Sequence, residues 1–139
     1  MMKKTSILDL ISRKLAPFML LFGFYLLAYG HTSPGGGFQG GVVMASGVIL
    51  LVVAQGVKAA ESLFPVSFLT KVEVTAFLAF MAAGLAGLAM GHGFLGNPMG
   101  QVQASAVPRV GMVLILNLII GIEVGSGISL ICLRLFRNE

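Results

Sequence analysis

Charged residues are scarce in this chain, and their scarcity excludes most water-soluble folds. Asp, Glu, Lys and Arg make up 10% of the 139 residues, whereas 57% are hydrophobic. A water-soluble domain usually carries about a quarter charged residues, so this chain has too few to cover a surface that faces water. The composition therefore predicts a membrane protein, and the length allows one domain.

Residues for covalent and metal chemistry are also few. The single cysteine, Cys132, excludes a disulfide within the chain, and we expect it to act as a small apolar side chain. The sequence has no Ser-His-acid grouping and no metal-ligand spacing, so we expect no catalytic site of its own, no metal and no cofactor. The net charge of +4 lies mostly beside apolar segments, which gives no indication of a nucleic-acid partner.

Long apolar runs dominate what is present. A helix needs about 20 apolar residues to cross a bilayer, and four continuous runs meet this need, at about 11–29, 38–57, 72–93 and 110–135. Barrel strands would alternate instead. We therefore predict an all-α membrane protein in which residues 1–139 form one domain of four transmembrane helices. Residues 6–15 share an apolar face, which predicts a short interfacial helix or the first turns of the first span.

Basic residues orient the predicted spans. Eight of the nine precede the first span, flank the connection between the second and third, or follow the fourth: Lys3, Lys4, Arg13, Lys14, Lys58, Lys71, Arg134 and Arg137. Only Arg109 lies on the other side. Because basic residues favour the cytoplasmic side, both termini are expected there. The sequence Thr70-Lys71-Val72-Glu73 has the pattern of a capping box, which would place the third span's start at the cytoplasmic edge.

Residues 30–41, GHTSPGGGFQGG, interrupt the apolar pattern between the first two spans. A phosphate-binding loop would need a lysine after the glycines, and none follows. A tight outer hairpin would explain Pro34 and some of the glycines. A close-packed helix start explains the rest better, because glycines let another backbone approach. We expect this start to be buried against a partner, with Phe38 as a wedge and Gln39 as a hydrogen-bonding group.

This segment resembles the signature of the MnhB/MrpB family. The residues that match its pattern are Gly30, His31, Pro34, Gly35, Gly36, Gly37, Phe38, Gln39, Gly40 and Gly41. The resemblance implies a small helical subunit of a multisubunit cation/proton antiporter in a prokaryotic plasma membrane. Its neighbours would be other membrane subunits and lipid, and its transported ions Na⁺ and H⁺.

The last span departs from the antiporter pattern. Antiporter members of the family often carry an acidic residue followed by Leu-Gly, and Asn117 stands at the equivalent place here. The stretch NLIIGIEVGSG looks closer to relatives attached to hydrogenase-type respiratory complexes. A stand-alone antiporter and the same module of a hydrogenase-type complex both stay open.

Glu123 is the only acidic residue deep inside a predicted span. A charged carboxylate at mid-bilayer costs at least about 2.5 kcal/mol, so Glu123 should be a proton or sodium site, or else a structural pair. Asn117, Glu73 and Lys71 are further candidates for an ion pathway. His31 could relay protons or orient the glycine segment; a haem between His31 and His92 is disfavoured, because both lie at the ends of spans.

Small residues mark two spans as contact surfaces. Gly121 and Gly125 lie about 160° around the last helix from Glu123, and Gly84 and Gly87 form a stripe on the third. The last helix thus has a small-residue face at Gly121 and Gly125 and a polar face at Glu123. Contacts on two opposite sides of one helix predict neighbouring subunits. The preferred function is a subunit that helps to form or pack an ion path at a subunit junction. The alternatives are a self-sufficient four-helix transporter acting as a homo-oligomer and a purely structural assembly subunit.

Overall fold

The chain folds into helices whose lengths suit a bilayer. The computed structural model describes residues 6–30, 34–91, 93–96 and 111–137. Its elements, in chain order, are α1 Ser6–Tyr29, α2 Gly37–Gln55, α3 Val57–Leu63, α4 Val66–Ala89 and α5 Gly111–Arg137. Every element within these ranges is a helix, and four are long and apolar enough to cross a membrane. The expected all-α membrane fold with four spans is confirmed, and the chain is a multi-pass membrane protein.

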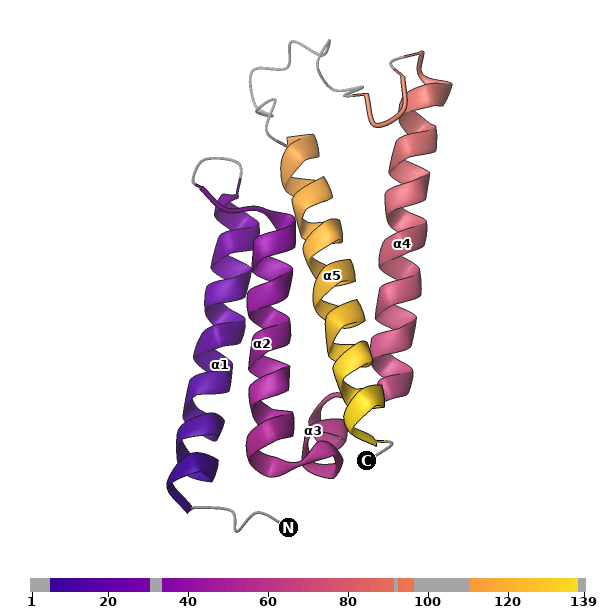
Figure 1. Ribbon diagram of the computed structural model, residues 1–139. Helices are drawn as coiled ribbons and strands as arrows, with labels where there is room; N and C mark the ends of the chain where they lie inside the picture. The colour runs from indigo at the N-terminus through magenta and orange to yellow at the C-terminus, as the bar shows by residue number, and fades with distance from the viewer. Residues whose placement is uncertain (1–5, 31–33, 92, 97–110, 138–139) are drawn as a thin grey trace.

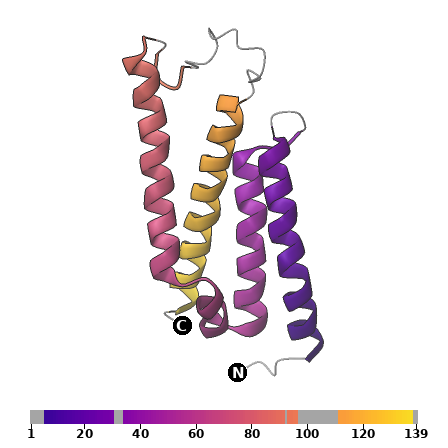
Figure 2. The ribbon, with the colours of Figure 1, turned by 180° about the vertical axis from the view of Figure 1, so that it is seen from behind.

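The four long helices stand in a row rather than in a closed bundle. Figures 1 and 2 show the order α1, α2, α5, α4, so that α2 and α5 form the middle of the row and α1 and α4 its two ends. Half of the α2 span is buried, compared with 22% of the α1 span and 17% of the α4 span. The outer helices therefore leave most of their surface for lipid or other proteins.

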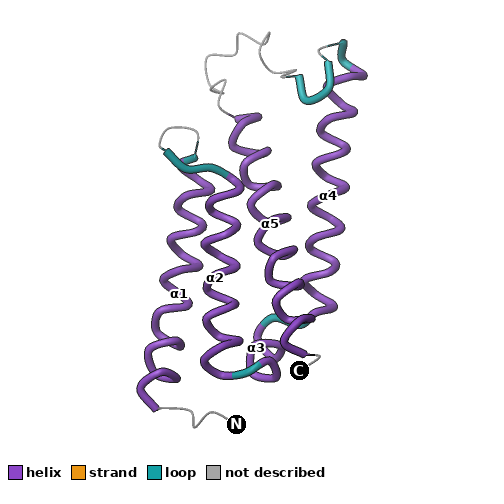
Figure 3. The backbone as a smooth tube through the Cα atoms, in the orientation of Figure 1, coloured by secondary structure: helices purple, strands orange, loops and turns teal. Residues whose placement is uncertain are grey.

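The short helix α3 closes one end of the row. Gly56, at φ +89°, allows the turn from α2 into α3, and its N–H donates to the Val52 carbonyl at 2.9 Å. Figure 3 shows α3 between two loop segments, at the end where α1 begins and α5 ends. Ala60 of α3 is fully buried there. It belongs to a core to which all five helices contribute: Ala16, Leu51, Val52, Ala60, Leu69, Leu130 and Leu133.

Residues 6–15 form the first turns of α1 and not a separate interfacial helix. An Arg13–Asp9 pair at 3.2 Å and a bond from the Ser12 hydroxyl to the Asp9 carbonyl at 3.0 Å support these turns. The apolar face that suggested an interfacial helix is the beginning of the first span. That the termini are cytoplasmic stays a prediction from the basic residues.

The expected start of the third span was wrong by about six residues. α4 begins at Val66 after Pro65, whose carbonyl accepts from the N–H groups of Phe68 and Leu69, both at 3.0 Å. Thr70 is therefore an interior residue, and its hydroxyl donates back to the Val66 carbonyl at 2.9 Å. There is no capping box at Thr70. The shift places Lys71 and Glu73 between one and two turns inside helix α4.

Candidate functional site

The glycine segment lets α2 pack against α5 of the same chain. A Cβ placed on Gly41 would lie 2.6 Å from the Gly121 carbonyl oxygen and 3.0 Å from the Gly125 nitrogen. One placed on Gly37 would lie 3.1 Å from the Asn117 Cα. Such distances leave room for hydrogen alone, so the two backbones are in direct contact. The close-packed helix start is present as expected, but on its α5 side the partner is the chain's own helix.

The same helix start also contacts α1. A Cβ on Gly40 would lie 2.8 Å from the Leu27 Cγ and 2.9 Å from the Gly23 carbonyl oxygen. Leu27 is fully buried and also lies against Gly121 of α5. The glycines of α2 therefore hold the three helices α1, α2 and α5 together at this end of the row.

Gly121 and Gly125, predicted as contact residues, face helix α2 of the same chain, and a neighbouring subunit on another face of α5 stays a prediction. A Cβ on Gly121 would lie 3.0 Å from the Gly37 carbonyl oxygen, and one on Gly125 would lie 3.3 Å from the Gly41 carbonyl oxygen. From the sequence alone, a helix of the same chain and a helix of a partner are equivalent as neighbours of a small-residue stripe. The row topology decides between them.

The stripe at Gly84 and Gly87 is likewise covered within the chain. A Cβ on Gly87 would lie 2.7 Å from the Gly93 carbonyl oxygen and 2.9 Å from the Gly96 nitrogen, and Gly84 faces the ring of Phe94. The segment after α4 therefore folds back onto the helix it follows.

Other residues of the glycine segment point away from this contact. Phe38 is 61% exposed, and Gln39 is exposed as well, so neither wedges into the described part of the chain. Before the helix, Gly30 and Gly36 approach closely, since a Cβ on Gly30 would lie 2.7 Å from the Gly36 Cα. Pro34 is exposed beside them. His31 and His92 lie outside the described residues, so the expectations for them stay predictions.

Asn117 lies where α5 meets the glycine segment. Its Nδ2 atom is 3.2 Å from the position of a Cβ on Gly30, and its Oδ1 atom is 4.0 Å from that on Gly36. This placement fits a helix contact. It also separates Asn117 from Glu123 by six residues, nearly two turns of α5.

Two carboxylates lie along the contact between α4 and α5. Glu73 of α4 directs its Oε1 atom to within 3.1 Å of the position that a Cβ on Gly127 would occupy. Gly127 and Glu123 are four residues apart on α5 and therefore share a face, about one turn apart. Both glutamates are half-buried. Among the described residues, the ion pairs are Arg13–Asp9 and Arg137–Glu61, so neither Glu73 nor Glu123 has a basic partner there.

The sequence did not reveal that Glu73 lies against α5, beside Gly127. The spacing of Thr70 and Glu73 assigns Glu73 to a helix cap, and a capping carboxylate needs no further explanation. Pro65 was the available signal, since proline is favoured where a helix begins. With α4 starting after Pro65, Glu73 falls well inside the span.

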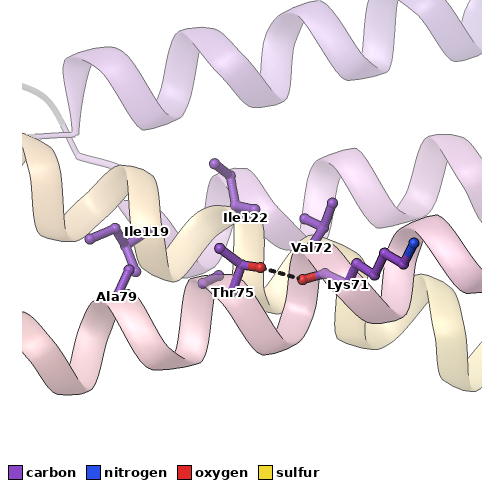
Figure 4. A pocket seen from close by; sticks show the side chains of 7 residues that line it. Lys71, Val72, Thr75, Ala79, Ile119 and Ile122 are labelled. Carbon is purple, nitrogen blue, oxygen red and sulfur yellow. Dashed lines mark hydrogen bonds between the residues drawn. The ribbon is translucent and has the colours of Figure 1, made fainter.

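Lys71 lies on a different side of α4 from Glu73. Two residues correspond to about 200° around a helix, and Lys71 lines a groove with Ile119 and Ile122 of α5 (Figure 4). The structure thus places Glu73 beside Gly127, about one turn of α5 from Glu123. Asn117 lies at the glycine segment, and Lys71 lies on another side of α4. Within the described ranges, no group of three His, Cys, Asp or Glu side chains could hold a metal ion.

Comparison with known proteins identifies the family. Residues 7–130 match MnhB, a domain related to the MnhB subunit of Na⁺/H⁺ antiporters. The B subunit of the Na⁺/H⁺ antiporter of Bacillus subtilis is 36% identical over 97 residues, which cover 70% of this chain and 67% of that protein. An uncharacterised protein of Methanocaldococcus jannaschii is 30% identical over 131 residues, covering 90% of this chain and 50% of its own length.

A further relative is the putative antiporter subunit mnhB2 of Staphylococcus saprophyticus, which is 37% identical over 83 residues, 59% of each chain. The present chain thus spans between half and two thirds of the length of these relatives. The match over residues 7–130 covers most of the chain, including the glycine segment, three spans and most of the fourth. The chain belongs to the MnhB family.

Proposed function

We propose that this chain is a transport subunit, without catalytic activity of its own, of a multisubunit cation/proton antiporter. Glu73 and Glu123 are proposed to form part of its ion path. The assembly would be an Mrp-type Na⁺/H⁺ antiporter or the same module of a hydrogenase-type respiratory complex. The observation that carries the proposal is the placement of Glu73 against Gly127, on the face of α5 that also carries Glu123, with no basic partner for either carboxylate among the described residues.

The physical argument rests on the cost of charge in the bilayer. A carboxylate without a basic partner is costly inside a bilayer. A bound proton or a bound cation such as Na⁺ offsets this cost. A site that accepts either, but favours one at a time, has the property that exchange of Na⁺ for H⁺ requires.

The row of helices supports a role at a junction between subunits. Glu73 and Glu123 are only half-buried, and the α4 helix beside them has most of its surface uncovered. Exposed carboxylates are costly against lipid, so other subunits or a water-filled path would cover them. Phe38 and Gln39, which project from the row, offer a second surface for a neighbouring subunit.

The test replaces each carboxylate with its uncharged isostere in the assembled complex. We expect Glu123→Gln and Glu73→Gln each to lower Na⁺-driven proton flux in membrane vesicles by about tenfold or more, while the subunits still copurify. The double variant should be no worse than the more severe single one, because groups that act as one unit are not additive. Asp9→Asn is the control, since its exposed pair with Arg13 contributes little.

Two outcomes would contradict the proposal. Full activity of an assembled complex carrying both glutamine substitutions would leave the carboxylates a structural role at most. Robust cation-driven proton flux by the purified chain alone, reconstituted in liposomes, would favour the self-sufficient homo-oligomeric transporter.

A further inference from the structure

An apolar groove with one basic residue runs between α4 and α5. It has a volume of about 350 Å³, and its walls are Val72, Ala76 and Ala79 of α4 with Ile119 and Ile122 of α5. Lys71 and Thr75 are its polar members (Figure 4). The Thr75 hydroxyl donates to the Lys71 carbonyl at 2.7 Å, so its proton is already used. The Lys71 ammonium is the polar group left to bind a ligand.

The groove continues toward the other half of the row. A second cavity of about 230 Å³ shares Val72 and Ile122 with the first and extends to Phe24 of α1 and Met44 of α2. Two hydroxyls in its wall, those of Ser126 and Ser129, donate to carbonyls of their own helix. The whole path from Lys71 is therefore apolar in effect.

The charge at the mouth of the groove is positive. Lys71 is exposed and has no ion pair with another residue in the part of the chain that the structure describes. Its side chain extends away from Ala79, toward the start of α4 (Figure 4). Lys58 and Arg134 lie on elements at the same end. A lysine of this kind lays its methylene stem on apolar surface and holds its ammonium near the headgroups.

We propose that this groove binds an anionic phospholipid, with one acyl chain along Val72 and Ile122 and the phosphate at Lys71. An apolar groove suits a chain of methylene groups, and the exposed Lys71 ammonium at its mouth suits the phosphate. A basic residue beside an apolar cleft at a membrane surface is the arrangement that recognises anionic headgroups. The proposal involves neither Glu73 nor Glu123, so its test is independent of the test of the ion path.

Lipid retention by the purified full-length chain tests this assignment. In native mass spectrometry from mild detergent, we expect phosphatidylglycerol to be retained about fivefold over phosphatidylcholine with the same acyl chains, the preference that one lysine near the surface supplies. Lys71→Gln should remove the preference and Lys71→Arg should keep it. Lys58→Gln, on α3 and outside the groove, is the matched control. Ala79→Phe should lower the retention of both lipids by filling the groove.

The contrary results are equally specific. Equal retention of the two lipids by the wild-type chain, or an unchanged preference in Lys71→Gln, would overturn the proposal. Displacement of the lipid by inorganic phosphate alone would show that the acyl chain contributes nothing, which also refutes it. If Lys71→Gln kept its lipid preference but lost a copurifying membrane subunit, Lys71 would instead pair with a carboxylate of a partner helix.

Discussion

Replacing Gly41 by alanine tests the contact that joins the two halves of the row. The new methyl group would lie 2.6 Å from the Gly121 carbonyl oxygen, 2.9 Å from the Val124 Cβ and 3.0 Å from the Gly125 nitrogen. Carbon atoms in comfortable contact are about 3.5–4.0 Å apart. Two of the three obstructing atoms belong to the backbone, so no side-chain rotation relieves the clash. Helices α2 and α5 must move apart.

The magnitude follows from two opposing effects. Overpacking of this kind costs about 1–3 kcal/mol, and a clash with backbone falls in the upper part of that range. Alanine returns about 1 kcal/mol, because it is a better helix former than glycine. The net loss should be about 1–2 kcal/mol, which corresponds to a change of about 5- to 30-fold in the unfolding equilibrium.

Gly47→Ala in the same helix is the matched control. Its methyl group would lie 3.3 Å from the Ala16 carbonyl oxygen and 3.4 Å from the Met19 Cβ, so the clash is slight and the gain in helix propensity offsets it. The assay is unfolding of the purified chain by a denaturing detergent, followed by circular dichroism. If Gly41→Ala proved as stable as Gly47→Ala, helix α2 would not touch α5 at Gly41 and the row order would be wrong.

Two further predictions concern single side chains. Leu27→Ala should cost about 2–5 kcal/mol in the same assay, because Leu27 is fully buried against Gly40 and Gly121, whereas Leu21→Ala, on the exposed side of α1, should cost far less. Thr70→Ala should change the free energy of unfolding by no more than about 0.5 kcal/mol, since Thr70 lies inside α4 and alanine is the better helix former. A loss of about 1 kcal/mol would instead indicate that Thr70 caps the helix.

The sequence predicted the type and number of long helices because bilayer thickness fixes both. The second span, expected at 38–57, is Gly37–Gln55, and the fourth, expected at 110–135, is Gly111–Arg137. The start of α4 was missed because Thr70 and Glu73 have the spacing of a cap, while Pro65 is equally typical of a loop. Local patterns compete at such a boundary, and burial of Leu69 in the core decides the outcome.

The candidate site was less accessible from sequence for a different reason. Glycine spacing identified Gly41, Gly121 and Gly125 as contact residues, but spacing holds no information about which helix is on the other side. Glu73 and Gly127 are 54 residues apart in the sequence, and their contact depends on α4 packing antiparallel to α5. Such long-range placement is a property of the topology, not of any local motif.

The order α1, α2, α5, α4 has a consequence for any larger assembly. A single row of helices has two broad sides and no central channel. It can therefore separate other subunits of a membrane complex but cannot form a pore by itself. Along the α4–α5 junction this row carries Glu73 beside Gly127 as well as an apolar groove with Lys71 at its mouth. Proteins that dock along the junction would therefore encounter both an acidic and a basic position of the same small chain.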